Sequence, residues 1–295
     1  MTTRRQFLAT TVTAAAAVAI RSVPVLSATT APSKRYPISA SDWMLLKRQK
    51  LGAPQLAKDC GLDAVEVDMG PLGNRPTIEN YFRDDEFLQS YLAKARELDL
   101  AISSFAMSCF YGQPFADHPK ADEFAAEWIA LMPKLGTTHG FLPIITKHNP
   151  TTAPAIRANL VMHLKHLAPL AEKAGVTVGL NTQLTAADNN RLLDDVGSPN
   201  VKIAYNVGEA VDAKRDPYAE LQTLGKDRIA QIIPTLSDGH WLKDDPRVDV
   251  PRLKGVLDEL NWSGYLVLQR SRMKHKSVRE NFSANAAYLN SIFNA

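Results

Sequence analysis

The chain has 295 residues, a formal net charge of +3 and only two cysteines, which are too few for a disulfide-rich scaffold. Three arginines and no acidic residue lie in the first 28 positions, so the rest of the chain carries no formal net charge. This balance gives no electrostatic reason to expect nucleic acid or an anionic membrane as a partner.

The N-terminal segment 1–28 is similar to a twin-arginine export signal. The pair Arg4 and Arg5 precedes a Thr- and Ala-rich apolar stretch that ends at Ile20, and small residues follow. The apolar stretch is too short and too rich in threonine to favour a membrane span. We therefore expect cleavage near residue 28, a flexible lead-in over residues 29–34, and a periplasmic or secreted mature protein without stable membrane insertion. An uncleaved amphipathic anchor is the alternative.

From residue 35 to residue 295, short β-type runs alternate with longer helical patterns, which is typical of βα repeats around a parallel sheet. This length suits one (β/α)₈ barrel of about 250 residues, and no Gly/Ser-rich linker or charge block divides it. The sequence therefore predicts an α/β protein with a single (β/α)₈ TIM barrel. Its eight strands are expected at Tyr36–Ala40, Ala64–Asp68, Ala101–Met107, Gly140–Ile145, Val176–Asn181, Val201–Asn206, Ala230–Thr235 and Tyr265–Gln269.

Two pairs of reactive side chains receive no chemical role from the sequence. His163 and His166 lie three residues apart in an expected helix over Pro154–Ala174, and such pairs are more often surface or packing residues than ligands. Cys60 would precede one strand, whereas Cys109 would follow the end of the next. They would lie toward opposite mouths of the barrel, so we expect no disulfide between them.

The strand Val201–Asn206 indicates which side chains point into the barrel. Successive side chains of a strand alternate between its faces, so Lys202, Ala204 and Asn206 share one face, and the opposite face is bulky and apolar. In a parallel barrel helices cover an apolar outer face, and a polar site lies at the C-terminal ends of the strands. The face that ends in Asn206 is therefore expected to point inward. The alternative is a strand of another α/β sheet with Asn206 in a turn.

The same alternation in four further strands gives an inward face that becomes polar toward its C-terminal end. The inward residues are expected to be Ala64, Glu66, Asp68, Thr177, Gly179, Asn181, Gln231, Ile233, Thr235, Val267 and Gln269. Active sites of this fold gather at that end. Phe105, Met107 and Phe110, near the end of the third strand, are expected to pack in the core rather than to wall the site.

Five segments, GLDAVEVD, VTVGLNTQ, VKIAYNVGEA, IIPTLSDG and GYLVLQRS, resemble the xylose isomerase-like TIM barrels, which include sugar isomerases, epimerases and inosose dehydratases. The resemblance covers nearly the whole mature chain. It implies a divalent metal held by a Glu, an Asp, a His and a second Glu at four strand ends. Here the matching positions hold Asn181, Asn206, Thr235 and Gln269, and Glu209 stands where the family has a further His.

These replacements remove the charge that the family's metal requires. Sites for Mg²⁺ or Mn²⁺ draw on carboxylates, and sites for softer ions draw on imidazole as well. The resemblance also implies that the two ligand glutamates move a proton next to a carbonyl, and a neutral amide cannot act as a general base. We therefore predict no tightly held metal and no other cofactor. Amides both donate and accept hydrogen bonds, so the rim can still bind a carbohydrate or polyol.

Charged residues near the amide rim complete the expected site. The candidates for substrate binding are Glu66, Asp68, His148, Asn181, Asn206, Glu209, Thr235, Asp238 and Gln269, and His240 lies close to them in the sequence. An acid or base role is open to six of these residues: Glu66, Asp68, His148, Glu209, Asp238 and His240. Of these, Glu66, Glu209 and His148 are the candidates for catalysis. For each of them a helix-capping or loop-solvated role is the alternative.

Three functions follow from these observations. The first is an exported, metal-free protein that binds a sugar or polyol and lacks isomerase activity. The second is an isomerase, epimerase or lyase that uses other acid and base residues on an unphosphorylated sugar or keto-sugar, since phosphate esters are mainly cytosolic. The third is a scaffold that binds a partner protein.

Overall fold

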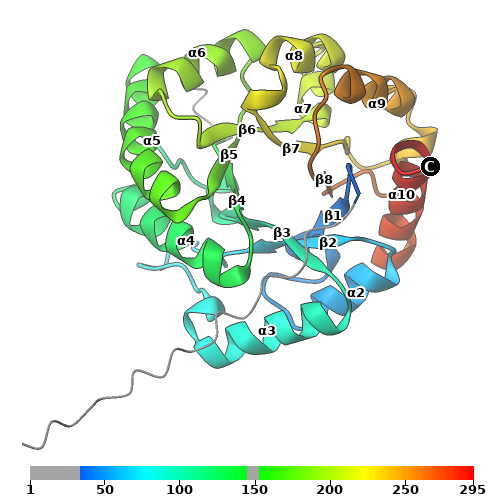
Figure 1. Ribbon diagram of the computed structural model, residues 1–295, viewed down its shortest axis with the longest axis horizontal. Coiled ribbons are helices and arrows are strands. Elements are labelled where there is room, and N and C mark those ends of the chain that lie inside the picture. The colour runs from blue at the N-terminus through cyan, green and yellow to red at the C-terminus, as the bar shows by residue number, and fades with distance from the viewer. Residues whose placement is uncertain (1–33, 145–152) are drawn as a thin grey trace, which may run out of the picture.

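Eight parallel strands close into one barrel in the computed structural model, which describes residues 34–144 and 153–295 (Figure 1). Each strand pairs with the next, and the last pairs with the first. The strands are β1 (Ile38–Ser41), β2 (Ala64–Asp68), β3 (Ala101–Ala106), β4 (His139–Pro143), β5 (Thr177–Asn181), β6 (Val201–Asn206), β7 (Ile229–Ile233) and β8 (Leu266–Leu268). The predicted (β/α)₈ barrel is confirmed, with strand ends within two residues of those expected.

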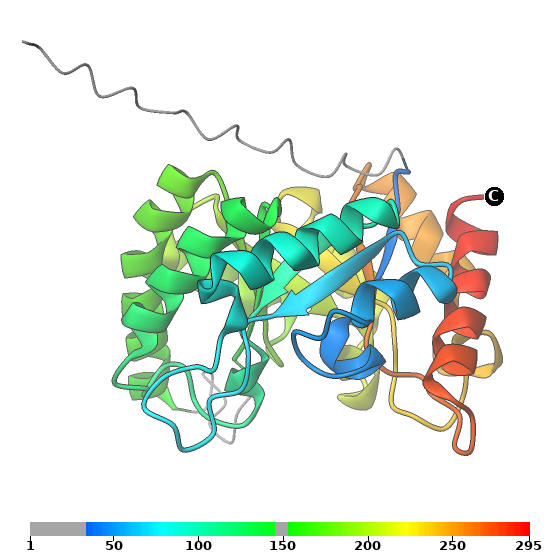
Figure 2. The same cartoon turned by 90° about the horizontal axis from the view of Figure 1, so that it is seen from below.

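The helices form a layer outside the strands, and α10 closes the ring beside α2 (Figure 2). They are α1 (Asp42–Leu45), α2 (Ala53–Asp59), α3 (Asp85–Glu97), α4 (Ala121–Leu135), α5 (Pro154–Ala174), α6 (Ala186–Val196), α7 (Val207–Asp212), α8 (Pro217–Leu224), α9 (Val250–Glu259) and α10 (Val278–Phe293). Four short 3₁₀ turns lie between them: η1 (Tyr81–Arg83), η2 (Ser108–Tyr111), η3 (Lys226–Arg228) and η4 (Leu242–Asp244). Among the residues described, no helix is both long and apolar enough to cross a membrane.

Polar caps and glycines set the ends of several helices. The Asp84 side chain accepts the backbone N–H of Phe87 and begins α3, and Asn206 in the same way begins α7 directly after β6. Helices α4 and α5 end at Gly136 and Gly175, with φ of 72° and 66°. A side chain is strained at such positive φ, so glycine stops these two helices at little cost.

The interior of the barrel holds the residues that strand alternation places there. Ala204, Ile233 and Val267 form a small buried cluster with Ala106 and Phe141. These five side chains come from strands on different sides of the barrel, so they meet only if they point inward. The opposite faces of the strands belong to the larger core shared with the helices. The inward alternation read from the sequence is therefore confirmed for β6, β7 and β8.

A β-bulge between β2 and β3 brings an additional polar side chain into the barrel. The register passes from Val65 opposite Ile102 to Glu66 opposite Ser104, so Ser103 is skipped. Two adjacent residues then face inward, as is common at a bulge. The Ser103 hydroxyl meets Ser39 of β1 at 2.6 Å, whereas Ser104 donates to Glu66 at 2.7 Å.

The two cysteines lie on separate elements and are free. Cys60 follows α2 and Cys109 belongs to η2, and both are buried. Burial raises the pKa of both thiols, so neither is poised as a thiolate.

Candidate functional site

A cavity of about 240 Å³ lies at the C-terminal mouth of the barrel. Asn206 ends β6, Glu209 lies in the first turn of α7, and Thr235 and Gln269 follow the ends of β7 and β8. These four residues, all predicted from the sequence, line the cavity. The other lining residues are Trp43, Met44, Tyr111, Gly208, Asp212, Leu236, Ser237 and Arg270.

Two amides hold the Glu209 carboxyl group at the rim of this cavity. The side-chain nitrogens of Asn181 and Asn206 lie 3.1 and 3.2 Å from its two oxygens. The Asn206 oxygen also accepts the backbone N–H of Glu209, which fixes the first turn of α7. Burial raises the pKa of Glu209 to about 8, although the Asn181 hydrogen bond and the Arg215 charge act in the opposite direction. This side chain is therefore largely protonated at neutral pH.

A second carboxyl group, Glu66, lies fully buried inside the barrel. Four neutral donors surround it: the Ser41 and Ser104 hydroxyls at 2.6 and 2.7 Å, and the Gln231 and Gln269 amides at 2.8 and 3.2 Å. Burial raises its pKa, and these hydrogen bonds offset only part of that shift. Glu66 does not line the cavity, but Gln269 connects it to the mouth.

The Tyr111 hydroxyl lies between the Asn181 amide, which contacts Glu209, and the Gln269 amide, which contacts Glu66. Sequence analysis did not identify Tyr111 as a site residue. Its hydroxyl lies 3.3 Å from the Gln269 side-chain oxygen and 3.4 Å from that of Asn181. A phenol has one proton, so it donates to one amide at a time. Trp43 and Tyr111 both approach Phe141 at ring distances of 6.4 and 6.1 Å, which gives the cavity an aromatic side.

Asp68 anchors loops instead of lining the cavity. It is fully buried, pairs with Arg48 at 2.8 Å and accepts the backbone N–H groups of Gly70 and Ser108. Burial raises its pKa to about 6, and the Arg48 charge limits the shift. Buried Asp42 lies in the same cluster, and burial together with the Asp68 charge raises its pKa. These contacts tie the loops that follow the first three strands to one another.

Asp238 and His240, also named from the sequence, do not line this cavity. Asp238 forms an ion pair with Arg272 at 2.7 Å. Burial acts to raise the pKa of Asp238, but the hydrogen bonds from Arg272 outweigh it and leave the pKa lowered. His240 is exposed, and His148 lies outside the described residues. Phe105, Met107 and Phe110 pack in the main core, as expected.

The atoms at the mouth form a poor donor set for a divalent cation. The Thr235 hydroxyl oxygen already accepts the backbone N–H groups of Gln269 and Arg270, at 3.3 and 3.2 Å. Two of the described lining residues carry carboxyl groups. The amide nitrogens of Asn181 and Asn206 face Glu209, whose raised pKa keeps it largely protonated, and exposed Asp212 already pairs with Arg247 at 3.6 Å. Mg²⁺ and Mn²⁺ need deprotonated carboxylates, so the residues do not fit a tightly held ion of this kind.

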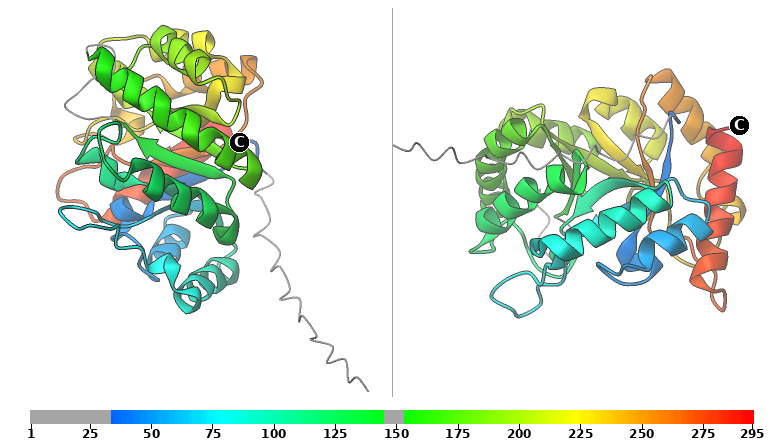
Figure 3. Two further views of the ribbon diagram at one scale, coloured as in Figure 1. Left: turned by 90° about the vertical axis from the view of Figure 1, so that its left-hand side faces the viewer. Right: turned by 60° about the horizontal axis from the view of Figure 1, so that its bottom comes forward.

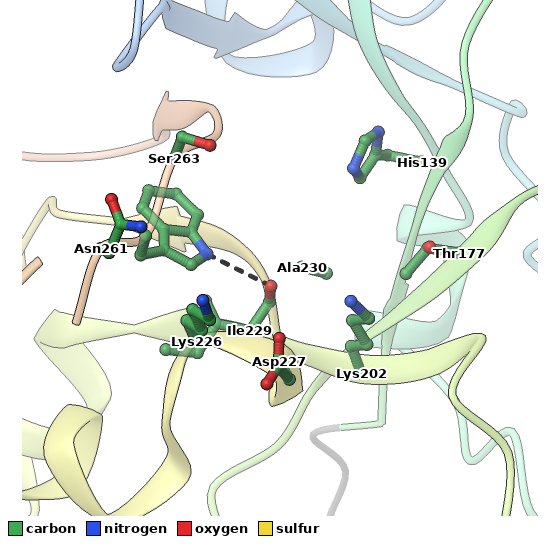
Figure 4. A pocket seen from close by; sticks show the side chains of 10 residues that line it. His139, Thr177, Lys202, Lys226, Asp227, Ile229, Ala230, Asn261 and Ser263 are labelled. Atoms are coloured by element: carbon green, nitrogen blue, oxygen red, sulfur yellow. Dashed lines mark hydrogen bonds between the residues drawn. The ribbon is translucent and has the colours of Figure 1, made fainter.

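A second cavity, of about 300 Å³, lies at the opposite mouth (Figure 4). It is lined by residues at or near the first positions of β4 to β7, including His139, Thr177 and Lys202, and by the segment before β8. The Trp262 indole donates to the Ile229 carbonyl at 3.3 Å, the dashed line in Figure 4. None of the predicted site residues that the structure describes lines this second cavity. Because barrels of this fold carry their chemistry at the C-terminal ends of the strands, the smaller cavity is the better candidate.

Comparison with known proteins points to one family. The profile of the xylose isomerase-like TIM barrel matches residues 54–292. No curated protein matches the sequence. D-allulose 3-epimerase from Methylomonas sp., solved in complex with D-allulose, is similar in structure, with a TM-score of 0.70 and 14% identity over 90% of this chain and 100% of that chain.

Two further solved structures have similar barrels. A sugar phosphate isomerase/epimerase from Parabacteroides distasonis has a TM-score of 0.67 and 17% identity, over 91% of this chain and 98% of that chain. The 3-keto-D-glucoside 4-epimerase of E. coli has a TM-score of 0.68 and 14% identity, over 87% of this chain and 99% of that chain. At such identities these likenesses concern the fold alone. Since the profile matches most of the sequence and the closed eight-stranded barrel agrees with it, the chain belongs to the xylose isomerase-like TIM barrel family.

Proposed function

We propose that this chain is an exported protein that binds an unphosphorylated sugar or polyol at the C-terminal mouth of its barrel. Neutral amides, and not a metal ion, orient the ligand there. The observation that carries the proposal is the convergence of Asn206, Thr235 and Gln269 on one cavity. Of the two carboxyl groups that line it among the described residues, Glu209 is held by two amides and has a raised pKa, and Asp212 pairs with Arg247.

The chemistry of the lining suits a polyol. Amide groups offer donors and acceptors that replace the hydrogen bonds of water to hydroxyl groups. Trp43 and Tyr111 supply flat apolar surfaces for the carbon-bound hydrogens of a sugar ring. A cavity of about 240 Å³ suits a small ligand. Similar barrels are a D-allulose 3-epimerase and a 3-keto-D-glucoside 4-epimerase, which supports sugars as the first ligands to test.

Calorimetry of the purified protein against unphosphorylated sugars, polyols and keto-sugars, with and without EDTA, tests the proposal. Asn206→Ala and Gln269→Ala should each weaken binding by about two- to twelvefold, because one buried hydrogen bond to a neutral partner contributes roughly 0.5–1.5 kcal/mol. EDTA should have no effect. The matched control is Gln222→Ala, which removes an exposed amide on α8.

Three results would count against the proposal. If EDTA abolishes binding, a metal ion orients the ligand. If both alanine variants bind as well as the parent, the ligand lies elsewhere. If no sugar binds at all, the partner-binding scaffold becomes the better reading of the fold.

A second candidate function is acid–base catalysis by Glu209. A carboxyl group with a pKa of about 8 in a small cavity can both donate and accept a proton near neutral pH. An isomerase or epimerase of a keto-sugar needs such a group next to the carbon that loses its proton. Glu66 and His148 remain alternative candidates for that role.

Deuterium exchange separates catalysis from simple binding. A keto-sugar incubated with the protein in D₂O should gain deuterium at the carbon next to its carbonyl. Glu209→Gln should abolish this exchange, and the glutamine oxygen can still accept from one of the two asparagine amides. Asp238→Asn, which alters a carboxylate that does not line the cavity, is the control. Absence of exchange with every bound keto-sugar would rule out this second function and leave the binding function standing.

A further inference from the structure

A group of metal-ligating side chains lies outside the barrel, between α4 and α5. The two helices run side by side on the outer surface (Figure 3). His163 Nδ1 lies 2.6 Å from Asp122 Oδ1, and His166 Nδ1 lies 2.8 Å from Asp122 Oδ2. One ligand atom of each residue lies within 4.8 Å of the other two. The three side chains therefore share one small volume, although Asp122 is 41 residues from His163 in the sequence.

The surrounding packing holds this group in place on one side and leaves it open on the other. The side chain of His163 is 13% exposed and meets the Phe115 ring edge-on at 5.7 Å. One turn earlier on α5, Asn159 donates to Asp117 at 3.1 Å, which ties the helix to the segment before α4. The side chain of His166 is 55% exposed. A small ion can thus enter from solvent without unpacking the helices.

The geometry points to a binding site for a divalent transition-metal ion such as Zn²⁺, with Asp122, His163 and His166 as its three protein ligands and water in the remaining position. Two imidazoles and one carboxylate are a ligand set that zinc uses in open sites. Mg²⁺ and Ca²⁺ prefer oxygen ligands, so this set discriminates against them.

Only a small rearrangement converts the hydrogen-bonded group into a metal site. In the free protein the Nδ1 atom of each imidazole is hydrogen-bonded to a different oxygen of the Asp122 carboxylate. On metal binding the ion takes the place of any proton on Nδ1, and each neutral ring then carries its proton on Nε2. With zinc–ligand bonds of about 2.0–2.1 Å and tetrahedral angles, ligand atoms stand roughly 3.3 Å apart. The two N···O distances, 2.6 and 2.8 Å in the free protein, must therefore widen by about 0.5–0.7 Å.

The charge of the site favours a cation. Although burial acts to raise the pKa of Asp122, the hydrogen bonds from His166 and His163 dominate and lower it. A bound ion would join the first turn of α4 to the middle of α5, and would stabilise the folded protein by binding the native state only.

Zinc titration of the full chain tests this site. The protein should carry no affinity tag and should first be freed of metal with EDTA and then dialysed. Calorimetry at neutral pH should give one Zn²⁺ per chain. Asp122→Asn and His166→Gln should each weaken binding by at least about tenfold, while His275→Asn, which removes an exposed histidine elsewhere, should leave it unchanged. Circular dichroism confirms that each variant is folded.

Two further readouts make the outcome decisive. Co²⁺ in place of Zn²⁺ should give visible absorption bands that both variants lose, and excess Mg²⁺ should not displace Zn²⁺. The inference is overturned if the folded parent binds no Zn²⁺, or if both variants bind it as tightly as the parent. It is also overturned if Asn181→Ala or Gln269→Ala removes the ion, which would place it at the mouth of the barrel.

Discussion

At the scale of single residues, the fully buried carboxyl group of Glu66 and the partly buried one of Glu209 are held in different ways. Glu66 receives four neutral hydrogen-bond donors and does not reach the cavity, whereas Glu209 lies at its rim between two amides. Burial raises the pKa of both groups. Only Glu209 can meet a ligand directly, so it is the group whose proton bears on both binding and stability.

Glu209→Gln should make the free energy of unfolding less dependent on pH. The pKa of Glu209 rises from 4.5 to about 8 on folding, so between these values the native state keeps a proton that the unfolded state has released. Stability therefore falls as the pH rises through this window, by up to about 1.4 kcal/mol per pH unit. Glutamine has no proton to lose, so part of this fall should disappear.

Urea unfolding at several pH values from 5 to 8 measures this effect. The control is Glu86→Gln, which removes an exposed carboxylate of α3 and should leave the fall in place. If the free energies of unfolding of the parent and of Glu209→Gln change in parallel with pH, Glu209 is ionised in the native state and the prediction is wrong.

At the scale of elements, the position of α7 depends on close contact with the loop after β7. A Cβ atom added at Gly208 would lie 2.6 Å from the Thr235 carbonyl oxygen and 3.0 Å from the Leu236 Cα atom. Both are backbone atoms, so a side chain there forces the helix and the loop apart. Gly208 thereby sets the distance between Glu209 on α7 and Thr235 across the cavity.

Gly208→Ala should destabilise the protein by about 1–3 kcal/mol and weaken ligand binding at the mouth. The matched control is Gly255→Ala in α9, where an added Cβ meets nothing within 4 Å. Alanine is the better helix former, so the control should raise stability by roughly 0.5–1 kcal/mol. Chemical denaturation and calorimetry measure the two effects. If the Gly208 variant is as stable as the parent, the loop after β7 moves aside without a cost in stability, and the prediction is wrong.

The strands could be predicted from the sequence because alternation has a fixed period, whereas the loops could not. Asn206 and Gln269 were found by counting along β6 and β8. Tyr111 and Trp43 lie in or next to short helical turns after β3 and β1, where no simple period says which way a side chain points. Asp68 continues the inward alternation of β2, but its burial against Arg48 depends on a loop contact that the sequence does not reveal.

The group of Asp122, His163 and His166 between α4 and α5 also shows which features could be predicted from the sequence and which could not. The spacing of His163 and His166 was visible in the sequence, but the third member, Asp122, comes from a different helix. Long-range contacts of this kind depend on how the helices pack around the barrel. Sequence analysis alone therefore assigned the histidines no chemistry.

At the scale of the whole molecule, export remains a prediction from the N-terminal segment, which lies outside the described residues. Replacing both Arg4 and Arg5 by lysine should retain the protein in the cytoplasm, because the paired arginines are what the twin-arginine resemblance rests on. The exported parent should begin near Thr29 in N-terminal sequencing. Export of the lysine variant by the twin-arginine route would contradict the prediction.

The central claim is that neutral side chains, and not a cation, form the ligand site of this barrel, and metal analysis tests it most directly. The tag-free His166→Gln variant, which lacks one ligand of the outer group, should be dialysed against Mn²⁺, Mg²⁺, Co²⁺ or Zn²⁺ and then freed of unbound ions. Elemental analysis should find well below one equivalent of any of these metals per chain. One full equivalent that disappears on Asn181→Ala or Gln269→Ala would contradict the claim.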